Sequence, residues 1–108
     1  MSYSSKVKIV VFVPESHTEA VREALAKEGA GKIGNYTHCS FSSSGIGRFR
    51  PEASARPAIG KVGKLELVQE ERIEVVCARA ILKNVIVAIK EVHPYEEFAL
   101  DIYSLEEF

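Results

Sequence analysis

The segment from Val7 to Val13 constrains the fold of this chain more than any other part of the sequence. Its residues are mainly β-branched or aromatic, which is typical of a β-strand. From Ile9 onward, both alternating faces of this strand are apolar. One face carries Ile9, Val11 and Val13, and the other carries Val10 and Phe12. Because a strand that is apolar on both faces needs cover on both faces, we expect apolar contacts on each side of it.

Two segments have the features of α-helices. The first follows the strand, where Ser16 and Glu19 have the spacing of a capping box and Gly29 and Gly31 would end the helix. The second covers Ala80 to Val92, where apolar residues recur at positions i, i+4 and i+8. Each predicted helix therefore has one apolar face that can pack against a sheet.

Three further segments are expected to form strands. They are Tyr36 to Ser43, Leu65 to Cys77 (which can break near Glu70 and Glu71), and Phe98 to Tyr103. The glycine-containing segment Ser44 to Pro51 would end the first of these strands, and residues 52–63 would form an exposed connection. The 108 residues suit one domain, residues 1–108, with a core from about 6 to 104.

The resulting order of elements, β-α-β-β-α-β, predicts an α+β fold, a ferredoxin-like sandwich with an antiparallel sheet. In that fold the strand order is 4-1-3-2, and both helices cover one face of the sheet. Val10 and Phe12 would then face outward beside Val76 of the third strand. Because an exposed apolar sheet face is a candidate interface, we expect a homo-oligomer whose sheets pack against one another.

The composition argues against several classes of partner. The chain is 46% hydrophobic and 27% charged, as soluble globular proteins are, and its formal net charge is -1 without a basic patch. A nucleic-acid partner is therefore not expected. The longest apolar run, Ile9 to Val13, is too short for a membrane span. We expect a cytoplasmic protein in which Cys39 and Cys77 are free thiols.

Polar residues gather at one end of the predicted fold. Pro94 cannot continue a helix and pushes His93 toward an extended conformation, so His93 should lie at a helix-to-strand junction. In the predicted topology, residues 93–97 lie at the same end as residues 14–17 and 45–50. His93, Tyr95 and Glu96 are therefore candidate ligand-binding residues.

Two kinds of ligand fit this end of the fold. Gly45 and Gly47, followed by Arg48, can present backbone N–H groups and a guanidinium to a small anionic ligand, although a hairpin or bulge would use the same glycines. A divalent metal ion is the cofactor that His17, His93 and Glu97 could hold, but no tight spacing joins them, and each histidine could instead be hydrogen-bonded locally.

The sequence offers weaker signs of catalysis than of binding. None of its serines lies in a G-x-S-x-G motif. Glu96 or His93 could still act as the general base of a hydrolytic or isomerising reaction. We therefore favour a binding or regulatory module over an enzyme, with an interaction domain as a third alternative.

Three segments resemble one domain of a known family. They are GNYTHCSFSSSGIGRFRP, AIGKVGKLELVQEERIEVV and HPYEEFALDIY. They are similar to the PII/CutA-like domain inserted in bacterial proteins of the Nif-three-like family, also called GTP cyclohydrolase I type 2 homologues. The similarity covers about Lys6 to Tyr103. Phe98 stands where family members usually have proline.

The resemblance implies a free-standing version of this insert domain, similar in fold to PII and CutA proteins. In the larger proteins the dinuclear metal ligands belong to flanking halves, and no position of this sequence matches those ligand motifs. The resemblance therefore does not imply cyclohydrolase activity. It does imply a homotrimer that holds a small ligand or an ion, as CutA does, in clefts between subunits.

Overall fold

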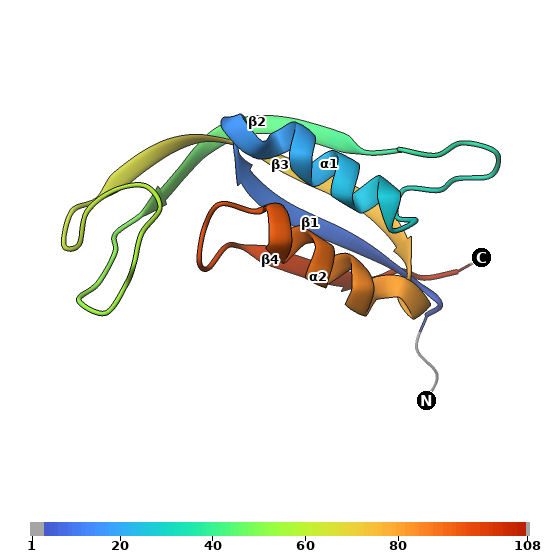
Figure 1. Ribbon diagram of the computed structural model, residues 1–108. Helices are drawn as coiled ribbons and strands as arrows, with labels where there is room; N and C mark the ends of the chain where they lie inside the picture. Colours follow the sequence, from blue (N-terminus) through green and yellow to red (C-terminus); the bar gives the residue numbers. More distant parts are fainter. Residues whose placement is uncertain (1–3, 108) are drawn as a thin grey trace.

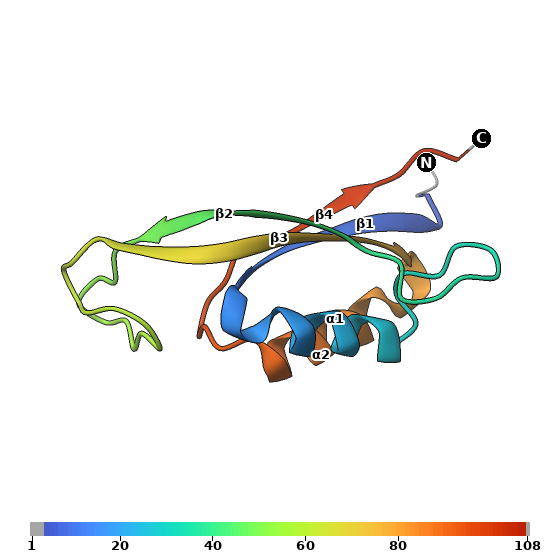
Figure 2. The ribbon, with the colours of Figure 1, turned by 90° about the horizontal axis from the view of Figure 1, so that it is seen from above.

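The computed structural model describes residues 4–107 as two layers, a sheet and a pair of helices (Figures 1 and 2). The strands are β1 (Lys6–Pro14), β2 (Phe41–Phe49), β3 (Glu66–Ala78) and β4 (Leu100–Ser104). The helices are α1 (Thr18–Lys27) and α2 (Leu82–Val92), and both lie on the same face of the sheet. The predicted α+β class is confirmed. No helix within the described residues is long and apolar enough to cross a membrane.

The sheet has the order β2-β3-β1-β4, and all its neighbouring strands are antiparallel. This is the predicted ferredoxin-like order. In the register, Val11 lies opposite Ile73 on one side and opposite Leu100 on the other. These residues face the helices and form the core with other buried side chains. Its buried members include Val7, Ile9, Val11, Val13, Val21, Leu25, Ile73, Val75, Cys77, Val85 and Ile89.

The face of β1 that points away from the helices is covered more than expected. Val10 is fully buried, although it lies outside the main core. Val10 lies opposite Glu74. The Glu74 carboxylate forms salt bridges with Lys8 Nζ at 3.6 Å and with Arg72 Nε at 3.4 Å. The Arg72 guanidinium also lies 5.6 Å from the ring centroid of the half-buried Phe12. The expectation that Val10 faces outward for a partner is therefore wrong, since side chains of the same chain cover it.

The second strand begins and ends later than the sequence predicts. Residues 36–40 lie outside β2, and residues 44–49, predicted as a glycine-rich end, pair with β3. Neither Gly45 nor Gly47 has a positive φ, so both adopt ordinary strand geometry. Gly47 matters for a different reason, because a Cβ atom there would overlap the Glu70 carboxylate, which would have to move. Strand β3 is continuous through Glu70, without the suggested break.

The helix ends follow partly different signals from those predicted. Short 3-10 turns, Glu15–His17 and Arg79–Ile81, precede α1 and α2. The predicted capping box does not form, because the Ser16 hydroxyl lies 2.7 Å from His17 Nδ1 and neither turn nor helix described here has a side-chain cap. Gly29, at φ 96°, follows the end of α1 as expected.

Strands β2 and β3 extend well beyond the helices as a two-stranded arm (Figure 2). At the tip of the arm, residues 50–65 form a loop that turns back (Figure 1). Helix α2 ends at Val92, and His93 is extended before Pro94 as the sequence predicts. The loop that leads from α2 to β4, residues 93–99, faces the arm loop and creates the site described next.

Candidate functional site

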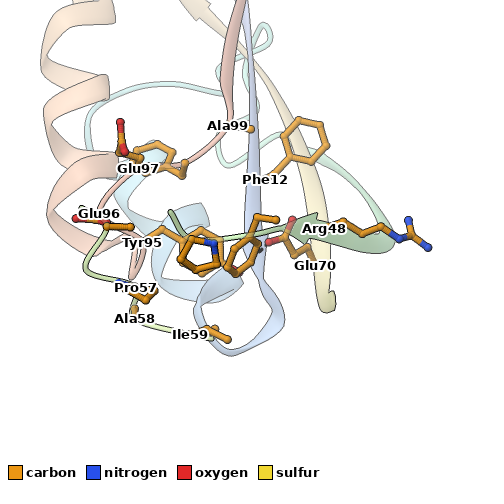
Figure 3. Close-up of a pocket in the computed structure, with 15 residues that line it drawn as sticks. Phe12, Arg48, Pro57, Ala58, Ile59, Glu70, Tyr95, Glu96, Glu97 and Ala99 are labelled. Carbon is orange, nitrogen blue, oxygen red and sulfur yellow. Dashed lines mark hydrogen bonds between the residues drawn. The ribbon is translucent and has the colours of Figure 1, made fainter. Parts of the chain in front are cut away.

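A cavity of about 250 Å³ lies between the arm and the α2–β4 loop (Figure 3). Its walls are mainly apolar and come from elements far apart in the sequence. β1 supplies Phe12, β2 supplies Phe49, the arm loop supplies Pro57 and Ile59, and the α2–β4 loop supplies Phe98. Polar groups enter from Glu70, Tyr95, Glu96 and Glu97. Apolar walls with a few convergent polar groups are typical of small-ligand sites.

A hydrogen bond between Tyr95 and Glu70 forms the polar part of this cavity. The Tyr95 hydroxyl donates to Glu70 Oε2 at 2.8 Å, and the Tyr95 ring packs edge-on against Phe49 with centroids 5.6 Å apart. Glu70 is only 7% exposed. Burial raises the pKa of the Tyr95 phenol, and the Glu70 carboxylate raises it further. Tyr95 is therefore a hydrogen-bond donor throughout the physiological range of pH.

His93 positions the loop and has no free ring nitrogen. Its Nδ1 accepts a hydrogen bond from the Tyr95 backbone N–H at 3.1 Å, so its Nε2 carries the proton and donates to the Phe12 carbonyl at 2.7 Å. The ring stacks on Phe98 at a centroid distance of 4.0 Å. Burial is the main cause that lowers the His93 pKa. A neutral His93 therefore holds residues 93–98 against β1 and does not point a ring nitrogen into the cavity.

The two glutamates of the loop lie at the exposed rim of the cavity. Glu96 Oε1 accepts a hydrogen bond from the Arg56 backbone N–H at 2.7 Å, which joins the α2–β4 loop to the arm loop. Glu97 is exposed and lines the same rim. Both side chains add negative charge at the entrance. Of the predicted ligand-binding residues, Gly47, Arg48, Tyr95 and Glu96 thus line this cavity.

The residues expected to bind an anion, Gly45, Gly47 and Arg48, lie on a strand instead of a turn. Because these residues belong to β2 and pair with β3 in register, they do not make a loop that could wrap an anion. Arg48 is exposed, and its guanidinium extends away from Tyr95 and Glu96 (Figure 3). Arg48 thus lines the cavity together with Tyr95 and Glu96, but its charged end points away from them.

The predicted metal ligands do not form a cluster within one chain. Among residues 4–107, no three His, Cys, Asp or Glu side chains lie close enough to hold a metal ion. His17 is near enough to His93 for its charge to lower the His93 pKa, but its Nδ1 lies 2.7 Å from the Ser16 hydroxyl. His17, His93 and Glu97 are thus neighbours at one end of the fold without forming a common site.

Sequence reasoning missed Glu70, the most buried carboxylate of the cavity. The sequence indicates Glu70 only as a point where the third strand can break. One signal in the sequence could have identified it. A strand with two glycines, Gly45 and Gly47, has room beside it for a large side chain of the neighbouring strand, such as that of Glu70. Gly45 lies directly opposite Glu70 in the sheet. Gly47 is the next residue on the same face of β2, and because it has no side chain, the Glu70 carboxylate can lie over it.

Solved structures of CutA proteins share this fold. The CutA structure from Xylella fastidiosa superposes with a TM-score of 0.71 at 17% identity, covering 97% of this chain and 88% of that one. The periplasmic divalent cation tolerance protein CutA from Archaeoglobus fulgidus gives a TM-score of 0.70 at 17% identity, covering 95% and 86%. The chain therefore has the same α+β fold as these CutA proteins.

Sequence similarity relates this domain to a more specific group. The Bacillus cereus protein related to NIF3 has a TM-score of 0.83 at 45% identity, covering 99% of this chain and 27% of that one. The GTP cyclohydrolase 1 type 2 homolog of Bacillus subtilis (strain 168) is 53% identical over 100 residues, and that of Mycobacterium tuberculosis is 48% identical over 98. No family model matches the chain.

The similarity covers one part of those larger proteins. The chain spans 27% of the length of the Bacillus subtilis relative, whereas 93% of the chain takes part in the match. It is thus similar to a single domain of the NIF3-related GTP cyclohydrolase 1 type 2 homologs, which confirms the resemblance noted in the sequence.

Proposed function

We propose that this chain is a homo-oligomeric module that binds a small ligand in the cavity between the arm and the α2–β4 loop. The observation that carries the proposal is the cavity of about 250 Å³, where apolar walls surround the Tyr95–Glu70 hydrogen bond. Sites of this kind bind ligands by burying an apolar body and orienting it through a few polar groups. We propose a binding role for Tyr95 and Glu96.

The contacts of His93 favour a structural role over general-base catalysis, and Glu96 helps to close the cavity entrance. Both ring nitrogens of His93 are engaged by Phe12 and Tyr95, and burial disfavours its charged form. Glu96 accepts a backbone hydrogen bond from Arg56 across the cavity entrance. The His93 contacts suit a residue that shapes a pocket, because a general base needs a free lone pair within reach of its proton and both ring nitrogens are engaged.

Exposed apolar side chains on the arm support the oligomeric part of the proposal. Ile46 and Leu67 are each more than half exposed, and they project from the same face of the β2–β3 ladder. Apolar residues grouped on a protruding surface mark candidate interaction sites. We propose that copies of the chain cover them, and the resemblance to PII and CutA proteins implies three copies.

The free state of Cys39 and Cys77 suits a reducing compartment such as the cytoplasm.

Calorimetry with a cavity-filling variant tests the proposal. The wild-type oligomer is titrated with amines, amino acids, nucleotides, phosphorylated metabolites and divalent cations. Ala58→Trp places a large side chain at the cavity lining, and Ala53→Trp makes the same change in the same loop outside the lining. We expect at least one titrant to bind the wild type and Ala53→Trp equally, and to bind Ala58→Trp at least tenfold more weakly. Silence across the panel, or equal binding to both variants, would contradict the proposal.

A further inference from the structure

We infer that the cavity recognises an organic cation, an alkyl ammonium or guanidinium group, with Glu70 as its counter-ion. The inference rests on the proposed function, because it concerns the same cavity and adds the charge of the ligand. It differs from the anionic ligand expected from Gly45, Gly47 and Arg48, which lie on β2 with ordinary strand geometry instead of forming a turn.

Glu70 is buried and only partly satisfied. It is 93% buried (7% exposed), and Oε2 accepts the Tyr95 hydroxyl, while no donor among residues 4–107 reaches Oε1 within hydrogen-bond distance. No buried side-chain oxygen described here lacks a hydrogen-bond partner, so Oε1 retains some access to solvent. A carboxylate has room for about four hydrogen bonds, and burial without a compensating partner is costly. A ligand with positively charged N–H donors would supply that partner at Oε1.

The chain directs its own cations away from this carboxylate. Arg72 lies two residues from Glu70 on the same strand face, yet its guanidinium contacts Glu74 and the Phe12 ring. The Arg48 guanidinium extends away from the cavity (Figure 3). Glu96 and Glu97 add two more carboxylates at the rim. The local charge therefore favours a cation over an anion.

The walls of the cavity suit the body of such a ligand. Phe49 and Tyr95 present aromatic rings to it, and an ammonium or guanidinium group is attracted to the face of an aromatic ring. The volume of about 250 Å³ is below the ~300–1,000 Å³ usual for drug-sized ligands. A cation with a short alkyl chain is the class of ligand that these dimensions allow.

A matched series of four-carbon probes tests the sign of the charge. The ¹⁵N-labelled protein is titrated with n-butylammonium, n-butylguanidinium, 1-butanol and butyrate, and amide shifts are followed by NMR. We expect the two cations to shift the amides around Glu70 and Tyr95, with dissociation constants of about 1–10 mM for probes this small. Butanol should bind at least about fivefold more weakly, and butyrate should not bind.

Two variants of the carboxylate site locate the effect. Glu70→Gln removes the charge and should weaken cation binding at least tenfold, whereas Glu23→Gln, an exposed residue of α1, should leave it unchanged. Gly47→Ala keeps the charge but displaces the carboxylate, and it should also weaken binding. Dispersed NMR spectra of each variant confirm folding. Equal cation binding by Glu70→Gln and the wild type would overturn the inference.

The outcomes separate this inference from the proposed function. Butyrate binding in preference to the cations would overturn the charge assignment and leave a ligand site in place. Shifts with none of the four probes would overturn the charge assignment, while the broader calorimetric panel still decides the proposed function. If Glu70→Gln also dissociates the oligomer in sedimentation experiments, the cation is a Lys or Arg side chain of a second copy. If the oligomer is unchanged, it is a free small molecule.

Discussion

The Tyr95 hydroxyl donates a 2.8 Å hydrogen bond to Glu70 and so joins the α2–β4 loop to the middle of β3. The neighbouring His93 joins the same loop to β1 through the Phe12 carbonyl. These two contacts hold one wall of the cavity in place. The site is thus built on strands of the sheet, and the loop contributes side chains whose positions the strands determine.

Removing the Tyr95 hydroxyl should destabilise the fold. In Tyr95→Phe the buried Glu70 loses its donor, and leaving a buried acceptor unsatisfied costs about 1–3 kcal/mol. The free energy of unfolding, measured by urea denaturation, should fall by that amount. Tyr36→Phe is the matched control, because Tyr36 is 74% exposed and should tolerate the same change. An unchanged midpoint in Tyr95→Phe would show that the hydrogen bond adds nothing to stability.

The two glycines of β2 should respond differently to alanine. A Cβ atom at Gly47 collides with the Glu70 carboxylate, whereas one at Gly45 meets no atom within 4 Å. Gly45→Ala should therefore be neutral or stabilising by up to about 1 kcal/mol, because alanine restricts the unfolded chain. Gly47→Ala should be less stable than Gly45→Ala by about 1–3 kcal/mol, since Glu70 must leave Tyr95.

Denaturation curves and crystal structures of the two glycine variants test this difference. In the structure of Gly47→Ala we expect the Glu70 carboxylate to have rotated away from Tyr95. Equal stability of the two variants, with the Tyr95 contact retained, would mean that Gly47 is not needed for the placement of Glu70.

Protonation of His93 should lower stability in mild acid. Its pKa in the folded protein lies below the ordinary value of 6.5, chiefly because of burial. The unfolded chain therefore takes up this proton first as the pH falls, so the contribution of His93 to stability is complete above about pH 7 and is lost progressively below about 6.5. His93→Gln should show a smaller loss of stability between pH 8 and pH 5 than the wild type.

An NMR titration of the His93 ring gives the direct measurement of this effect. The expected result is a midpoint below 6.5, the ordinary value for histidine. A midpoint above that value would mean that the charged form is favoured in the fold, and stability would then rise in acid.

A charge on the arm should dissociate the oligomer. Leu67 is 53% exposed on the arm, and Leu67→Glu would place a carboxylate in the proposed contact. Val87→Glu is the matched control, because Val87 is 52% exposed on α2, away from the arm. Sedimentation velocity at micromolar concentration should show an oligomer for the wild type and for Val87→Glu, and a smaller species for Leu67→Glu. A wild-type protein that is monomeric in this experiment would contradict the proposal of a homo-oligomer.

Local patterns were enough to predict most of the fold. The apolar strand from Val7, the two apolar helix faces and the proline at position 94 each act within a few residues, and they predict the element order and the strand order. The second strand was misplaced because the glycines at 45 and 47 were interpreted as signs of a turn. Their strand geometry depends on pairing with β3, which no local pattern encodes.

The candidate site was harder to predict because it depends on long-range register. Tyr95 and Glu96 were identified from the turn that contains them. Glu70 was missed, since its role arises from its position across from Gly45 and from the docking of a loop 25 residues away in sequence. The predicted topology correctly brings Arg48 to the cavity, but it could not show that the guanidinium extends away from Tyr95 and Glu96.

Native mass spectrometry of gently purified protein, mixed with the calorimetric panel, tests most directly whether the cavity under Tyr95 holds a small molecule. The account predicts a bound mass of one ligand per protomer on the wild type and on Ala53→Trp, and its loss from Ala58→Trp. No bound mass on any form, or the same bound mass on all three, would contradict it.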